Sequence, residues 1–195
     1  MKGKVRFAVA ALLLAAFVAV FAGEALAAKN PSWVGISSRT WRVVRNSAQN
    51  DITKSNYWIV QVSVETTNNS KDRDITAFYD CQLRVSAKLA SGPRMQVGSG
   101  ARAFTRRFVD FIKQPEGTTV RDTADFPDPR NVTIWPGQKF TRNMDLGLHR
   151  FVTLSSINSW RDVNEFLDKV GGNRNSILTD VTIGYDFHVR SKKSD

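Results

Sequence analysis

Cationic side chains gather in the middle of this chain of 195 residues. The window from Arg84 to Lys113 holds seven Lys or Arg residues and a single acid, Asp110. Many cations with few carboxylates create a positive potential that attracts polyanions. The window therefore predicts an anion-binding or partner-binding surface; the alternative is that the basic charge only keeps the protein in solution. The candidate residues are Arg84, Lys88, Arg94, Arg102, Arg106 and Arg107.

Residues that could carry catalysis or hold a metal ion are few. The chain has two histidines, His149 and His188, and one cysteine. A zinc or copper site needs several such ligands converging on one point. The sequence also lacks the Gly-x-Ser-x-Gly turn of a serine hydrolase and the Gly-Lys-Ser/Thr loop that cradles phosphate. We therefore predict no catalytic residue, no cofactor and no metal site.

Three carboxylates, Asp122, Asp125 and Asp128, lie at regular spacing in the loop expected over 114–130. Asp-rich loops can bind calcium, but the Asp-x-Asp-x-Asp-Gly order is missing and Arg121 and Arg130 flank the acids. A solvated loop whose acids pair with arginine is the preferred interpretation. A glycan-cleaving enzyme could instead pair Asp122 with Asp125, which keeps a hydrolase open as the alternative function.

The first 27 residues predict a secretory signal peptide. Lys2, Lys4 and Arg6 precede an apolar run over 7–21, and Ala25-Leu26-Ala27 offers a small-x-small cleavage site. The other interpretation is a retained membrane anchor, but the apolar run is shorter than the roughly 20 residues that cross a bilayer. We expect export, to the periplasm or beyond, and no membrane-spanning helix after cleavage.

Cleavage would leave one domain over 28–195 that still carries a net charge of +8, against +10 for the whole chain. Outside the cytoplasm the available polyanions are lipopolysaccharide, acidic glycans, anionic lipid headgroups and shed DNA. We therefore do not expect intracellular nucleic acid as a partner. Phe104 and Phe108 could stack on bases. Both would serve equally well in a hydrophobic core.

The composition, 42% hydrophobic and 24% charged with 12 Gly and 6 Pro, excludes collagen-like, coiled-coil and disordered chains. Alternating apolar residues predict strands. In one run Cys81, Leu83, Val85, Ala87 and Leu89 share a face, so the lone cysteine is expected in the core. The expected strands are Trp33–Ile36 and Thr40–Arg45 (as one strand or a pair), Tyr57–Thr67, Asp74–Leu89 with a bulge near Asp80, Arg94–Val97, Phe104–Ile112, Asn131–Trp135, Lys139–Leu148 and Ile177–Arg190. For Phe104–Ile112 a helix is the alternative, because Phe104 and Phe108 lie four positions apart.

One segment has helical rather than strand periodicity. Apolar residues recur every three or four positions from Ser159 to Val170, Ser159 and Asp162 form a capping box, and Gly171-Gly172 follows as a stop. The predicted fold class is thus all-β and mainly antiparallel: a sandwich with one short helix inserted before the last strand.

The stretch from Tyr57 to Leu148 resembles the small immunoglobulin-like modules of exported bacterial proteins, the FxLYD-like and telokin-like group. The residues that carry the resemblance are Val60–Val64, Thr67–Ser70, Phe78-Tyr79-Asp80 and Trp135–Lys139. The resemblance implies an immunoglobulin-like β-sandwich that binds a partner without catalysis. We therefore expect an exported accessory module whose basic face contacts an anionic envelope polymer or a protein, with the oligomeric state left open.

Overall fold

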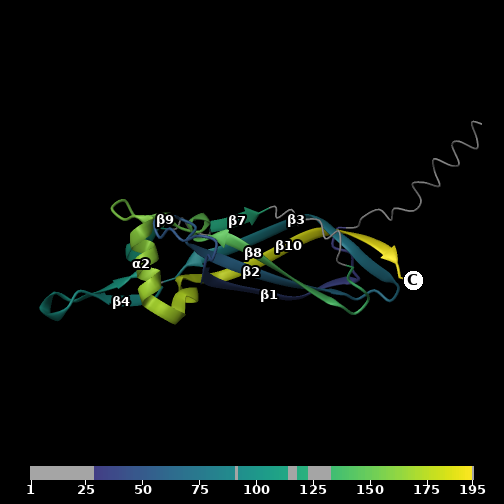
Figure 1. The fold of residues 1–195 in the computed structure, drawn as a ribbon, viewed down its shortest axis with the longest axis horizontal. Helices are drawn as coiled ribbons and strands as arrows, with labels where there is room; N and C mark the ends of the chain where they lie inside the picture. Colours follow the sequence, from purple (N-terminus) through teal and green to yellow (C-terminus); the bar gives the residue numbers. More distant parts are fainter. Residues whose placement is uncertain (1–28, 91, 114–117, 123–132, 195) are drawn as a thin grey trace, which may run out of the picture.

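A computed structural model describes residues 29–90, 92–113, 118–122 and 133–194. The predicted signal peptide over 1–27 lies outside these residues. In the described part of the chain, two β-sheets run along an elongated molecule, and a helix crosses one end (Figure 1).

Each of the two main sheets has three antiparallel strands. The strand order of the first sheet is β1-β2-β8, with bounds Val34–Arg45, Trp58–Asn68 and Lys139–Gly147. The order of the second is β10-β3-β7, with bounds Leu178–Lys193, Arg73–Leu89 and Thr118–Asp122.

The alternating pattern of the sequence explains why these sheets pack face to face. Val60, Val62 and Val64 of β2 are almost fully buried, and so are Leu83 and Val85 of β3. Burying one such side chain contributes about 1.5–3 kcal/mol. The prediction of an all-β, mainly antiparallel sandwich is confirmed.

Short elements complete the end of the sandwich that the helix crosses. Two small antiparallel pairs form between β4 and β5 and between β6 and β9. Their bounds are Arg94–Val97, Phe104–Arg107, Ile112–Lys113 and Thr153–Leu154. Four 3-10 helices, η1 to η4, cover Gly100–Arg102, Phe108–Asp110, Leu148–Arg150 and Gly171–Ile177 within the described ranges.

The helix α2 (Trp160–Val170) begins and ends as predicted. The Ser159 hydroxyl accepts a hydrogen bond from the Asp162 backbone N–H, and the Asp162 carboxylate accepts one from the Ser159 N–H at 2.7 Å. Gly171 follows at a φ of 75°, which favours glycine. The buried face of α2 presents Phe166 to Phe108 and Phe111.

The bulge expected near Asp80 is also present. Asp80 has a φ of 49°, and the pairing of β3 with β10 shifts register between Tyr79 and Gln82. Because of the extra residue, side chains three positions apart on either side of the bulge point to the same face of the sheet. Phe78 and Cys81 therefore both reach the core.

The expected strand over Phe104–Ile112 is wrong beyond Arg107. Phe108 turns inward as the first residue of η2 and is fully buried against Phe166. The Asp110 carboxylate accepts a hydrogen bond from the Arg107 backbone N–H at 2.7 Å, which ends the strand there. Burial of one phenylalanine against a distant helix thus outweighs the local strand tendency.

The strand expected over Asn131–Trp135 is described only in part. Residues 131 and 132 lie outside the described residues, and Ile134 forms a single bridge with Ile75. At the other end of the chain, Ile177 belongs to η4, so the last strand begins at Leu178.

Candidate functional site: a cationic hairpin

The six candidate cations divide into two groups. Arg84 and Lys88 lie on β3, within the second main sheet. The other four lie on the β4–β5 hairpin, defined here as residues 94–107 (Arg94, Arg102, Arg106 and Arg107). This hairpin projects beyond α2 at one end of the molecule (Figure 1).

The two cations of β3 are held in ion pairs. A guanidinium nitrogen of Arg84 lies 2.8 Å from the Asp186 carboxylate, and the Lys88 ammonium lies 3.0 Å from Asp180. A hydrogen bond from Asn30 lowers the pKa of Asp186, and the charges of Lys29 and Arg84 lower it further. Asp186 is therefore ionised at neutral pH, and it lies close enough to Arg84 to offset part of its charge.

In the described part of the chain, Arg94, Arg102 and Arg107 have no such partners, and Arg106 interacts with the Asp162 carboxylate only through its charge, which lowers the pKa of Asp162. Within the described ranges, no carboxylate forms an ion pair with any of the four hairpin arginines. Arg94 pairs directly opposite Arg107 across the two strands, so both side chains leave the same face. Like charges in this position repel each other. An arrangement that is unfavourable in the unbound protein becomes favourable when an anion lies between the two guanidinium groups.

Packing at its base fixes the direction of the hairpin. Gly92 has a φ of 67°, and a Cβ there would lie 2.8 Å from the Cβ of buried Phe108. The Phe108 N–H donates to the Pro93 carbonyl at 3.2 Å. Arg106 lies over the Phe111 ring at 4.0 Å, and Met95 packs against the core beside α2. The base is thus part of the hydrophobic core, although the rest of the hairpin is solvent-exposed.

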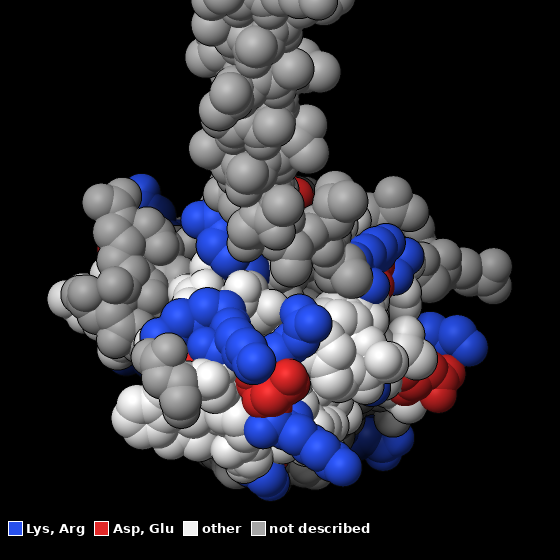
Figure 2. All heavy atoms as spheres, turned by 90° about the vertical axis from the view of Figure 1, so that its right-hand side faces the viewer, with Lys and Arg blue, Asp and Glu red and all other residues white. Residues whose placement is uncertain are grey.

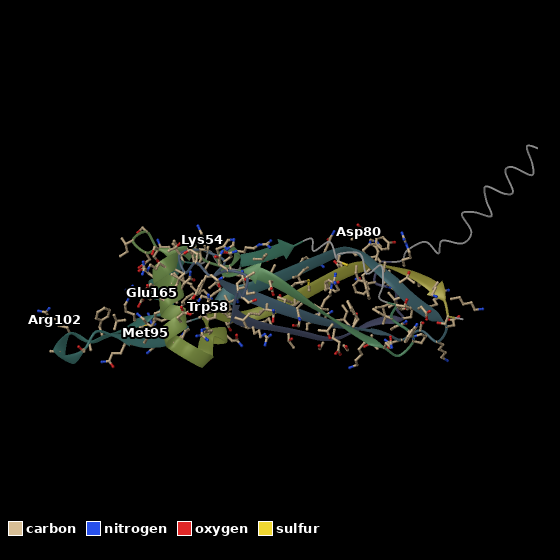
Figure 3. All side chains as sticks on the ribbon, viewed as in Figure 1. Lys54, Trp58, Asp80, Met95, Arg102 and Glu165 are labelled. Carbon is tan, nitrogen blue, oxygen red and sulfur yellow. The ribbon has the colours of Figure 1, made fainter. Side chains whose placement is uncertain are left out.

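The tip of the hairpin is a glycine-containing turn. Gly98 and Gly100 have φ values of 88° and 62°, a region that side chains disfavour. The short helix η1 follows, closed by a hydrogen bond from the Ala103 N–H to the Gly100 carbonyl at 3.1 Å. Figure 3 shows Arg102 at this tip and Met95 beside α2.

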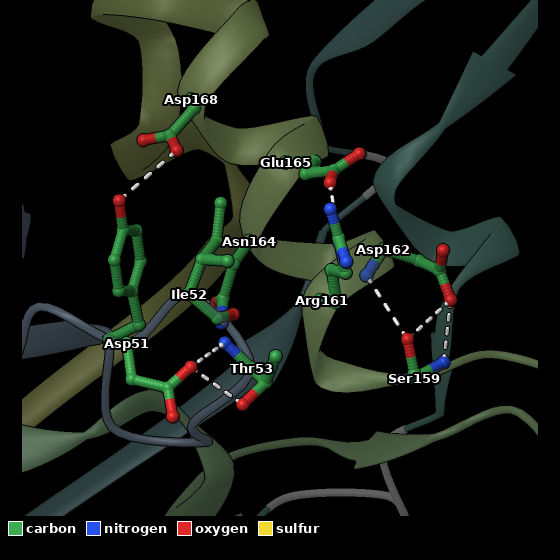
Figure 4. Close-up of polar contacts among 10 residues, drawn as sticks. Asp51, Ile52, Thr53, Ser159, Arg161, Asp162, Asn164, Glu165 and Asp168 are labelled. Carbon is green, nitrogen blue, oxygen red and sulfur yellow. Dashed lines mark hydrogen bonds and ion pairs between the residues drawn. The ribbon is translucent and has the colours of Figure 1, made fainter.

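A network of polar contacts holds the loop over 46–57 against α2 (Figure 4). The buried Asn164 amide donates to the carbonyls of Ile52 and Lys54, at 2.6 and 2.9 Å. The Tyr57 hydroxyl donates to Asp168 at 3.4 Å, and Asp51 accepts from Thr53. These carboxylates serve local structure. The network therefore fixes α2 to the loop over 46–57 at the end of the molecule that carries the hairpin.

The opposite end of the molecule distributes its charge differently. There, Lys139 lies 3.0 Å from Glu65 and Lys192 lies 3.8 Å from Asp74. Figure 2 shows acidic side chains lying among the cations on this end. Cations interleaved with acids produce a weaker outward field than the hairpin, where residues 94–107 include no acid.

A second polar cluster lies between the two sheets. Tyr185 of β10 and Arg142 of β8 line a small recess together with Val64, Thr66, Phe78 and Phe140. Burial raises the pKa of the Tyr185 phenol, and its hydrogen bond with Cys81 raises it further. Burial lowers the pKa of the Arg142 guanidinium. The phenol is neutral at any physiological pH, so it is not poised to act as a base.

The histidines take ordinary structural positions. His188 stacks on Tyr79 and lies 3.6 Å from Asp80, while His149 lies against the Ser55 carbonyl and the edge of Trp160. Among the described residues, no group of three or more His, Cys, Asp or Glu side chains is arranged to hold a metal ion. The loop acids Asp125 and Asp128 lie outside the described residues, and the side chain of Asp122 is not described.

Sequence reasoning did not foresee the direction of Phe104. Its ring is 54% exposed on the hairpin, whereas Phe108, four residues later, is fully buried. In the structure Val97 lies opposite Phe104, so the two side chains share a face of the hairpin. The sequence alone did not say that Phe108 would leave the strand.

Fold and site together define an antiparallel β-sandwich protein with a projecting cationic hairpin. Comparison with protein-family models, with curated proteins and with solved structures found no match. The resemblance to immunoglobulin-like modules is therefore not supported by these comparisons and stays a prediction. In the part of the chain that the structure describes, no helix has both the length and the apolar character needed to span a bilayer.

Proposed function

We propose that this protein is an exported, non-catalytic binding module that contacts an anionic polymer of the cell envelope through the β4–β5 hairpin. The observation that carries the proposal is the pair of like charges formed by Arg94 and Arg107 across the hairpin. Arg102 adds a further exposed cation at the tip. The predicted signal peptide and the resemblance to exported modules fit this role.

Arginine side chains suit anion binding better than other cationic side chains do. Its planar guanidinium donates two parallel hydrogen bonds to a phosphate or carboxylate, which adds geometry to the attraction. Two such groups side by side match a repeating anion better than an isolated charge. A protein partner with an acidic surface is the other occupant expected from the sequence, but no feature of the hairpin favours it over a polymer.

The hydrolase alternative gains no support from the described residues. Two of its three loop acids lie outside them, and the described carboxylates near α2 are engaged in capping and loop contacts. We therefore base the proposal on binding alone.

Heparin affinity chromatography of matched variants tests the proposal. Arg94→Gln/Arg107→Gln removes the hairpin pair, and Arg84→Gln/Lys88→Gln makes the same change in net charge at paired positions. We expect the hairpin variant to elute at clearly lower salt, with a salt dependence reduced by about one unit per arginine that contacts the polymer. Neither variant should lose more than about 1 kcal/mol of stability, because exposed substitutions cost little.

Equal shifts for the two variants would show that retention follows net charge alone and would refute the hairpin site. Unfolding by urea, followed through tryptophan fluorescence, confirms that both variants remain folded during the comparison.

A further inference from the structure

The second face of the hairpin carries three apolar side chains beside Arg106. Because strand neighbours alternate between faces, Met95, Val97, Phe104 and Arg106 share the side opposite Arg94 and Arg107. Met95 is half-buried beside α2, and Arg106 packs on Phe111. The remaining pair, Val97 and Phe104, lies nearer the tip, and Phe104 is 54% exposed.

A second exposed apolar side chain lies at the same end of the molecule. Ile157, in the segment between β9 and α2, is 90% exposed. This segment is bonded to the residues that follow β5: the Ser155 N–H donates to the Phe111 carbonyl at 2.9 Å, and the Asn158 amide donates to the Asp110 carbonyl at 3.3 Å. Thus the end of the molecule that carries the unpaired arginines also presents Phe104 and Ile157 to solvent.

We propose that the β4–β5 hairpin binds the surface of an anionic lipid membrane. This inference rests on the anion-binding role of the hairpin in the proposed function and names the anion as the headgroup phosphates of a lipid surface instead of a dissolved polymer. The arginines contact the phosphates, while the exposed ring of Phe104 enters the interface between headgroups and acyl chains. A charged polymer dissolved in water offers no apolar layer for these side chains. Anionic lipid supplies both chemistries, so it complements both faces of the hairpin.

The arginines and the apolar residues make separable contributions. Each cation held near an anionic membrane surface strengthens partitioning about fivefold. Transfer of one phenylalanine ring from water to an apolar environment strengthens it by about tenfold or more. Loss of Phe104 therefore affects binding to lipid but leaves binding to a soluble polyanion unchanged.

Co-sedimentation with vesicles tests the inference on the purified protein. The vesicles contain phosphatidylglycerol in phosphatidylcholine, with pure phosphatidylcholine as the uncharged control. We expect binding to the anionic vesicles only, at least fivefold weaker for Phe104→Ser and about 25-fold weaker for Arg94→Gln/Arg107→Gln. Trp135→Ser is the matched control, because Trp135 is also exposed, at 57%, but lies in the turn before β8.

Retention on heparin, measured in parallel, separates the two proposals. Phe104→Ser should elute from heparin like the unchanged protein. If Phe104→Ser binds anionic vesicles as well as the unchanged protein, or if Trp135→Ser weakens binding as much, the membrane inference is overturned and the polyanion proposal stands. If Arg94→Gln/Arg107→Gln changes neither vesicle binding nor heparin retention, both proposals fail.

Discussion

At the scale of the residue, ion pairing distinguishes cations that the sequence presents as equivalent. Arg84 and Arg94 both stand in the basic window, yet Arg84 lies 2.8 Å from Asp186 while Arg94 faces Arg107. Asp186 is more than 100 positions away from Arg84 in the sequence. Local spacing therefore predicted the cationic surface but could not predict which of its charges an acid already neutralises.

Cys81 shows the opposite case, in which a local pattern was enough. Its alternation with Leu83 and Val85 predicted a core position, and the thiol is 2% exposed beside Tyr185. We predict that a thiol reagent such as Ellman's reagent labels the native protein about 10³-fold or more slowly than the urea-unfolded chain, because labelling requires opening of the core. Rapid labelling without denaturant would contradict this position.

At the scale of the element, strands were predicted well and their ends less well. Periodicity located β2, β3, β8 and β10 to within a few residues, and capping chemistry located α2. The strand predicted through Phe108 is wrong for a tertiary reason. The Phe108 ring packs against Phe166 of α2, a contact that the local sequence pattern does not predict. The candidate site depends on that same turn, because the hairpin ends where Phe108 enters the core.

A substitution at Gly92 tests how tightly the base of the hairpin packs against Phe108. We predict that Gly92→Ala destabilises the protein by about 2–3 kcal/mol, because it adds a left-handed backbone cost to a clash with Phe108. Gly100→Ala is the matched control: it has a similar φ of 62° with no atom within 4 Å of the added Cβ. It should cost only about 1 kcal/mol. Urea unfolding measures both losses, and equal values would show that the base of the hairpin is loosely packed.

At the scale of the whole molecule, the two ends differ in both charge and shape. One end carries α2, the hairpin and exposed apolar residues, and the other carries cations that lie among acids (Figures 1 and 2). The basic composition predicted a positive field but not its direction. The direction follows from where the acids lie: within the described residues they form direct ion pairs with cations of the sheets and none with the arginines of the hairpin.

Acid should weaken the fold through carboxylates of the sheets and of the start of α2 whose pKa values are lowered. Hydrogen bonds lower the pKa of Asp186, Glu65 and Asp162, with Asn30, Ser37 and Ser159 as the respective principal donors. A carboxylate whose pKa is lower in the folded than in the unfolded state stabilises the fold above its unfolded pKa of about 4. That contribution is lost as the pH falls through the folded value.

We therefore predict that the free energy of unfolding is nearly constant from pH 7 to pH 5 and falls steeply below about pH 4. Asp186→Asn removes the ion pairs of Asp186 with Lys29 and Arg84, so it should lower stability at pH 7 by about 1 kcal/mol and make the decline in acid shallower. Asp72→Asn, at an exposed position in the turn between β2 and β3, is the control and should leave both unchanged. Urea titrations at a series of pH values measure these slopes. An acid slope as steep in Asp186→Asn as in the unchanged protein would show that Asp186 does not have a lowered pKa in the folded state.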